Sequence, residues 1–156
     1  MKAKAEVLDI LGKMLAEELV ALNQYMLHAE MQENWGYLRL AKEIHKLSIV
    51  EMKHAEALME RVLFLEGTPN LSDFPKLNVG KDVKQQLQND LALEQSAVVA
   101  YNEAIAALRK PGDQGSADLL KRLLLDEEEH EDFLATQLDI IKDIGLEKYL
   151  LERSKV

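Results

Sequence analysis

Residues with metal-binding chemistry occur twice along this 156-residue chain, in the same order and at a constant distance. Each set holds two glutamates, a tyrosine and a histidine: Glu18, Tyr25, Glu51 and His54, then Glu94, Tyr101, Glu127 and His130. Every member of the second set lies 76 positions after its counterpart. Four carboxylates and two imidazoles suit a pair of transition-metal ions held between helices. The repeat therefore predicts a two-metal site built from two matching halves.

Each set contains a glutamate three residues before a histidine, as in Glu51 with His54 and Glu127 with His130. Residues three apart lie on one face of a helix, so a single ion can contact both side chains. One such pair is weak evidence in a chain with 28 acidic residues, but two copies on inner helix faces are specific. The alternative is solvated helix surface, which we expect for most of the acidic run 126–132 apart from Glu127.

Charge balance also favours metal ions. Buried carboxylates without a compensating charge are costly, and no Lys or Arg falls on the inner faces near them; Arg61 lies near the end of its helix. Four ionised carboxylates carry four negative charges, which two divalent ions would neutralise. The chain has no cysteine, so thiolate zinc sites, iron–sulfur clusters and disulfides are excluded. Oxygen and nitrogen ligands suit iron or manganese.

The formal net charge of −9 argues against a nucleic-acid surface or an anionic membrane surface. The amino-terminal segment is interrupted by Asp9 and Lys13 before it could form the apolar core of a signal peptide, and no apolar run approaches membrane-spanning length. A cytoplasmic location is therefore expected.

Four segments show apolar residues at steps of three and four, the spacing of helices that face a common core. The metal-binding candidates interrupt these apolar stripes, which cover residues 5–34, 40–58, 87–108 and 120–141. Turns are expected at 34–36 and 111–115, each at or beside the midpoint between the two glutamates of its half. Equal distance from a turn places the glutamates of each antiparallel pair at the same height.

Residues 66–82 contain two prolines and two glycines and lack helical periodicity. Extended at roughly 3.3 Å per residue, this segment could reach the full length of the bundle. Gly145 should end the fourth helix, and residues 146–154 should form a short fifth helix. The expected fold is a single all-α domain over residues 1–156: a ferritin-like four-helix bundle with one long crossover between the second and third helices.

Several neighbouring residues have more than one interpretation. Tyr25 lies on the inner stripe two turns from Glu18. Its hydroxyl could form a hydrogen bond to a carboxylate, or the residue could donate an electron. Alternatively, Tyr25 is an ordinary core aromatic whose hydroxyl finds a hydrogen-bond partner. For Tyr101 the core role is preferred. His28 and His45 lie off the ligand faces and are expected to be surface or interface histidines.

The chain resembles the bacterioferritins along essentially its whole length. The resemblance is carried by NQYMLHAEMQENWG, EMKHAE, FLEGTPNL, DLALE, DEEEHED and GLEKYL, at residues 23–36, 51–56, 64–71, 90–94, 126–132 and 145–150. It implies that Glu18, Glu51, His54, Glu94, Glu127 and His130 form a ferroxidase centre, with Glu51 and Glu127 bridging two irons. It also implies oxidation of Fe(II) by O2 or H2O2 and storage of ferric mineral in a homo-oligomeric cage of 24 subunits built from dimers.

The resemblance further implies a haem b shared between two subunits. Met52 follows Glu51 and is turned about 100° away from it, toward another surface; alone it would be an ordinary interface methionine, but bacterioferritins ligate haem iron from this position. A small ferredoxin is a possible partner for iron release. His45, Lys46 and Val50 depart from residues found in many relatives, which affects accessory iron sites on the cavity wall.

Three alternatives to the storage ferroxidase stay open. A rubrerythrin-like peroxide reductase also uses duplicated Glu-x-x-His pairs, although the chain has no cysteine for a rubredoxin-type iron centre. A di-manganese oxidase would use the same ligands. A non-catalytic haem- or metal-binding cage subunit would hold metals for structure alone.

Overall fold

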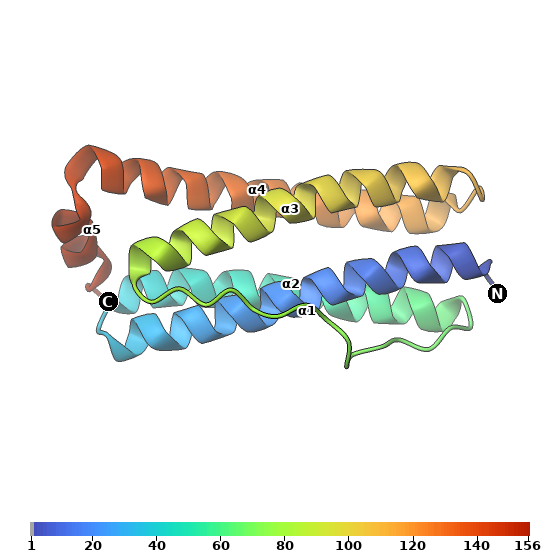
Figure 1. The fold of residues 1–156 in the computed structure, drawn as a ribbon, viewed down its shortest axis with the longest axis horizontal. Coiled ribbons are helices and arrows are strands. Elements are labelled where there is room, and N and C mark those ends of the chain that lie inside the picture. Colours follow the sequence, from blue (N-terminus) through green and yellow to red (C-terminus); the bar gives the residue numbers. More distant parts are fainter. Residues whose placement is uncertain (1) are drawn as a thin grey trace.

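The computed structural model describes residues 2–156, and this range contains five helices. They are α1 (Ala5–Asn34), α2 (Leu38–Phe64), α3 (Val83–Arg109), α4 (Gln114–Ile144) and α5 (Leu146–Arg153). Helices α1 and α2 form one antiparallel hairpin, α3 and α4 form a second, and α5 lies across one end of the bundle (Figure 1). The predicted four-helix bundle with a fifth short helix is confirmed.

Local sequence explains where the helices begin and end. Asp82 caps α3 by accepting a hydrogen bond from the Gln85 amide at 2.9 Å, and Asp113 caps α4 by accepting one from the Ser116 amide at 2.9 Å. Gly145 ends α4 with a φ of 88°, a conformation that glycine adopts without a steric penalty. No helix in the described part of the chain is long and apolar enough to cross a membrane.

The crossover, residues 65–82, runs back along the bundle from the end of α2 to the start of α3 (Figure 1). Its final part is fixed to α1 by two hydrogen bonds from backbone amides to side chains. The amide of Asn78 donates to Oε1 of Gln24 at 3.0 Å, and the amide of Gly80 donates to Nε2 of His28 at 3.0 Å. The crossover therefore covers part of α1 that the helical pattern alone would leave at the surface.

The apolar core falls into two clusters, one toward each end of the bundle. One includes Leu11, Leu15, Leu58, Leu108 and Leu120. The other includes Leu40, Ile44, Leu87, Leu134 and Tyr149. On α2, α3 and α4 the predicted ligands lie between the members of the two clusters, and on α1 Glu18 lies next to Leu19, the last member of the first cluster on that helix. The bundle thus places a polar layer near mid-height, between two apolar layers.

Candidate metal centre

The polar layer contains all six side chains predicted to bind metal. Four helices supply them: Glu18 from α1, Glu51 and His54 from α2, Glu94 from α3, and Glu127 and His130 from α4. Each is at most 6% exposed. These six residues could hold metal ions, and we call them the metal centre. The structure brings together every residue that the repeat predicted.

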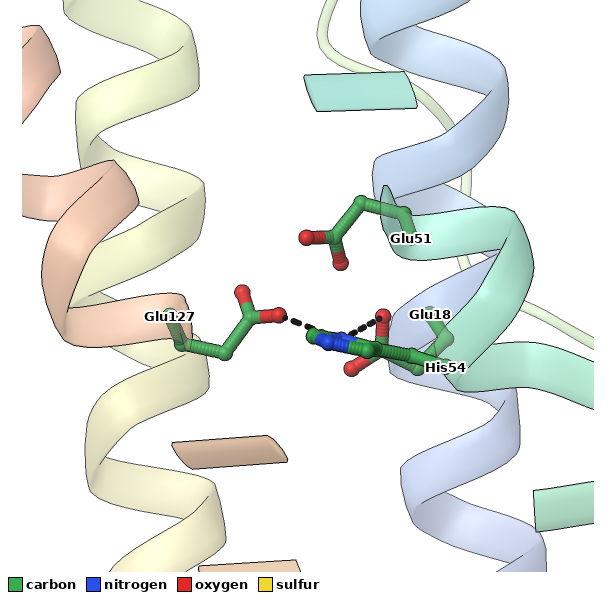
Figure 2. A group of neighbouring side chains, drawn as sticks. All are labelled: Glu18, Glu51, His54 and Glu127. Atoms are coloured by element: carbon green, nitrogen blue, oxygen red, sulfur yellow. Dashed lines mark ion pairs between the residues drawn. The ribbon is translucent and has the colours of Figure 1, made fainter. Parts of the chain in front are cut away.

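The metal centre divides into two overlapping sets, in each of which one ligand atom per residue lies within 4.8 Å of the others. The first set is Glu18, Glu51, His54 and Glu127, shown in Figure 2. The second set is Glu51, Glu94, Glu127 and His130. Because Glu51 and Glu127 belong to both sets, they lie where two neighbouring ions could share them.

The two histidines occupy equivalent places. Nδ1 of His54 lies 2.9 Å from Oε1 of Glu127 and 3.4 Å from Oε2 of Glu18. Nδ1 of His130 lies 2.9 Å from Oε1 of Glu51 and 3.5 Å from Oε1 of Glu94. Each imidazole thus approaches a carboxylate of the opposite hairpin most closely. The 76-residue repeat is therefore expressed in space as two nearly matching halves.

Many of the nitrogen and oxygen atoms in the centre that could bind a metal have no hydrogen-bond partner. Among the described residues, ten buried side-chain nitrogen or oxygen atoms have no hydrogen bond, and seven of them belong to these six residues. The short contacts between histidine and carboxylate lack hydrogen-bond alignment, since the atoms involved are among the seven. Within residues 2–156, only His54 and His130 form ion pairs with these carboxylates. Buried donors that converge in this way fit bound cations.

Electrostatics gives the carboxyl groups different proton affinities. Burial and the charge of Glu18 raise the pKa of Glu51 well above its ordinary value, and raise that of Glu127 to about 10. Burial also acts on Glu94, but its hydrogen-bonding neighbours, Glu127 first, outweigh burial and lower its pKa. The raised pKa values favour the protonated forms of Glu51 and Glu127, and the lowered pKa favours the ionised form of Glu94.

The carboxylates around His54 make its imidazole strongly basic. Burial acts to lower the pKa of His54, but the carboxylates of Glu127, Glu18 and Asp126 outweigh burial and raise it to about 11. A metal ion at Nδ1 would replace the proton on that nitrogen.

Both tyrosines contact the metal centre across the gap between hairpins. Tyr25 on α1 donates a hydrogen bond of 2.5 Å to Oε1 of Glu94 on α3. Tyr101 on α3 donates to Oε1 of Glu18 on α1. Burial and the nearby carboxylates raise the pKa of both hydroxyls, which keeps them protonated as donors. Tyr101 is thus a core aromatic that also bonds a ligand, in the same way as Tyr25.

The prediction for His28 was wrong. The structure buries His28 completely, because the crossover covers this face of α1. Its Nε2 accepts the bond from the Gly80 amide, so its Nδ1 carries the proton and donates to Oδ1 of Asp90 at 2.8 Å. Gln24 donates to the same oxygen at 2.9 Å. We call Gln24, His28, Gly80 and Asp90 the crossover cluster. His45 is exposed, as predicted.

Sequence reasoning missed two acidic residues. Asp126 was grouped with solvated surface, yet its Oδ2 lies 2.8 Å from Nε2 of His54. Its position directly before Glu127 was the only available signal, since its partner lies on another hairpin. Asp90 lies one helical turn before Glu94 on the same face of α3, which could have marked it as buried.

Comparison with known proteins agrees with this architecture. The model of the ferritin-like domain matches residues 8–144. The chain is 45% identical to a bacterioferritin of Brucella melitensis over 96% of this chain and 92% of that protein. It is 42% identical to a bacterioferritin of Mycobacterium leprae over 96% of this chain and 94% of that protein, and 39% identical to one of Rhodobacter capsulatus over 97% and 94%. The chain therefore belongs to the bacterioferritin family of ferritin-like proteins.

Proposed function

We propose that this protein stores iron and acts as a ferroxidase, taking Fe(II) as substrate at the metal centre. Membership of the bacterioferritin family supports iron storage. The observation that supports the ferroxidase step is the set of seven nitrogen and oxygen atoms without hydrogen bonds on six buried residues, arranged as two overlapping groups. This arrangement accepts two cations side by side.

The reaction removes one electron from each of two Fe(II) ions. With O2 as acceptor, two Fe(II) and two protons give two Fe(III) and H2O2; with H2O2 as acceptor, two Fe(II) and two protons give two Fe(III) and two water molecules. Four carboxylates neutralise two divalent ions and stabilise the higher charge of the products. Glu51 and Glu127 contribute to both groups, so they hold the two substrates close enough to react with one acceptor molecule.

Protons leave the centre as iron enters it. Glu127 and His54 hold protons when unloaded, because their pKa values are raised to about 10 and about 11. Binding of Fe(II) displaces these protons and makes them available to the acceptor. Tyr25 and Tyr101 keep Glu94 and Glu18 oriented toward the ions through their hydrogen bonds.

Storage would take place inside a homo-oligomeric cage, for which the family suggests 24 subunits built from dimers. Haem b is the cofactor that would be shared by two subunits. Met52 fits this role because it lies next to Glu51 on α2 yet is 37% exposed, so its thioether is available to a group bound outside the bundle. When bound, haem supplies a one-electron redox centre at the subunit surface. A ferredoxin could then deliver electrons for iron release.

The proposal is tested by anaerobic loading with Fe(II), followed by mixing with air in a stopped-flow instrument, on protein sized by gel filtration. We expect about two Fe(II) bound per chain, a rapid oxidation phase, and ferric product retained by a large assembly. Glu51→Ala and His54→Ala should abolish the rapid phase and leave the helical circular dichroism unchanged. Glu56→Ala, at an exposed position on the same helix, is the control.

Other results would select a rival. Tight metal binding without a rapid phase would indicate a structural metal site. Unchanged kinetics in both ligand variants would refute the assignment of the centre. Turnover of peroxide that is faster than oxidation by O2, with no ferric product retained, would favour a peroxide reductase. Preferential loading with Mn(II) over Fe(II) would favour a di-manganese oxidase.

A further inference from the structure

The two histidines of the metal centre differ on the side that faces away from the carboxylates. Nδ1 of His54 faces Glu18 and Glu127, whereas its Nε2 lies 2.8 Å from Oδ2 of Asp126. The Asp126 side chain is 48% exposed and the His54 side chain only 4%, so Asp126 reaches in from the rim of the bundle. A carboxylate at this nitrogen keeps the Nε2 proton in place and leaves Nδ1 free for a metal.

His130 has no equivalent support. The residue 76 positions before Asp126 is Val50, which directly precedes Glu51 as Asp126 precedes Glu127. Valine has no side-chain acceptor. Among residues 2–156, no hydrogen bond involves Nε2 of His130, and its ring lies edge-on to the Tyr25 ring with 6.4 Å between centroids. The inner contacts of the two histidines match, but their outer contacts do not.

We propose that the two metal positions are unequal, and that Asp126 is the positioning residue that causes the difference. The position formed by Glu18, Glu51, His54 and Glu127 binds first and more tightly, and the position that uses His130 binds second. This inference rests on the proposed two-metal centre. Carboxylate partners of metal-binding histidines fix the ring and its tautomer, and their removal costs about 10- to 100-fold in metal affinity.

The direct test titrates Co(II) into the full-length protein by calorimetry and visible absorption, and Zn(II) into protein labelled with ¹⁵N in its histidines. We expect two binding events of different affinity. The first equivalent of Zn(II) should shift the ring-nitrogen signals of His54, and the second those of His130. Absence of any tight binding would refute the metal centre itself. Two equal sites, or a first shift at His130, would refute only the inequality.

Variants at the two related positions separate positioning from structure. Asp126→Ala should weaken the first event about 10- to 100-fold and leave the second unchanged. Asp126→Asn keeps an acceptor without the charge and should give a smaller loss. Val50→Asp supplies the missing partner and should strengthen the second event, which brings the two affinities together. Asp132→Asn, an exposed position on the same helix, should change neither.

The melting temperature of unloaded protein serves as the control for folding, and we expect Asp126→Ala to leave it nearly unchanged because Asp126 is half exposed. Equal weakening of both events by Asp126→Ala would overturn the proposal. An unchanged second event in folded Val50→Asp would overturn the explanation by the missing acceptor.

Discussion

The metal centre and the crossover cluster are both polar groups buried in the same bundle, yet they solve the problem of burial differently. In the crossover cluster, Oδ1 of Asp90 accepts bonds from Gln24 and His28, and His28 accepts one from the crossover backbone, so that Oδ2 of Asp90 is the single buried side-chain atom of this cluster without a hydrogen bond among the described residues. In the metal centre, seven side-chain nitrogen and oxygen atoms have no hydrogen-bond partner. A polar group satisfied by the protein itself supports the fold, whereas one left unsatisfied is available for a ligand.

The pKa values express the same difference. Burial raises the pKa of Asp90, but His28 and Gln24 act in the opposite direction and partly offset it. In the metal centre, burial and neighbouring carboxylates act together on Glu51. The first arrangement stabilises the chain as it stands, and the second costs stability until a cation arrives.

The largest expected effect tests the structural role of the crossover cluster. Asp90→Ala should lower the free energy of unfolding by about 2–6 kcal/mol, because it leaves two buried donors without their acceptor at about 1–3 kcal/mol each. Guanidinium unfolding of the variant and of wild type at equal assembly state measures this effect, with exposed Asp139→Ala as the control. The number of Fe(II) bound per chain should stay unchanged. A loss of Fe(II) binding with normal stability would erase the distinction between the two regions.

In contrast, removing an ionisable group from the metal centre should raise the free energy of unfolding of the unloaded protein. Glu51→Gln removes a buried group that is costly to ionise, so the unloaded protein should gain about 1 kcal/mol or more in unfolding free energy. The same variant should lose more than roughly 100-fold in affinity for the two ions, because even outer partners of metal ligands are worth that much. Thermal unfolding with and without Zn(II) measures both effects. Destabilisation of unloaded Glu51→Gln would show that this carboxyl group supports the fold.

The contribution of the metal centre to stability should depend on pH only when metal is absent. The raised pKa values of Glu51, Glu127 and His54 stabilise the unloaded protein at low pH. This contribution is lost as the pH rises from the ordinary pKa of each group, 4.5 for Glu127 and 6.5 for His54, to its raised pKa, about 10 for Glu127 and about 11 for His54. Zn(II) replaces the protons, so its affinity should rise about tenfold per pH unit for each proton displaced. Melting temperatures between about pH 6 and about pH 8 should therefore diverge with and without Zn(II). A constant gap would mean that no proton leaves on binding.

The smallest effects concern the tyrosines. Tyr25→Phe and Tyr101→Phe each remove one hydrogen bond to a ligand carboxylate, and each should cost about 1 kcal/mol of metal binding free energy. We expect similar, modest decreases in the Fe(II) oxidation rate for both. A large loss in Tyr25→Phe alone, together with a tyrosyl radical signal that this variant lacks, would instead show that Tyr25 donates electrons.

The sequence predicted the helices, the crossover and the repeated ligands, but it missed contacts between side chains of different segments. Helical periodicity gave the long helices, and the 76-residue repeat gave the six residues that converge in space. His28 was misplaced because its burial depends on a non-helical crossover that no periodicity describes. Asp126 was missed because its partner, His54, lies on the other hairpin and its own repeat position holds valine. Such one-sided contacts need coordinates.

The crossover joins two hairpins that depend on each other for chemistry. Residues 70–76 are exposed along their whole length, while the segment after them is fixed to α1. A protease should therefore cut the exposed part first and release two helical fragments with no covalent link. Neither fragment holds a complete ligand set, since Glu51 and Glu127 come from different hairpins. Binding of divalent cations should consequently favour reassociation of the two fragments.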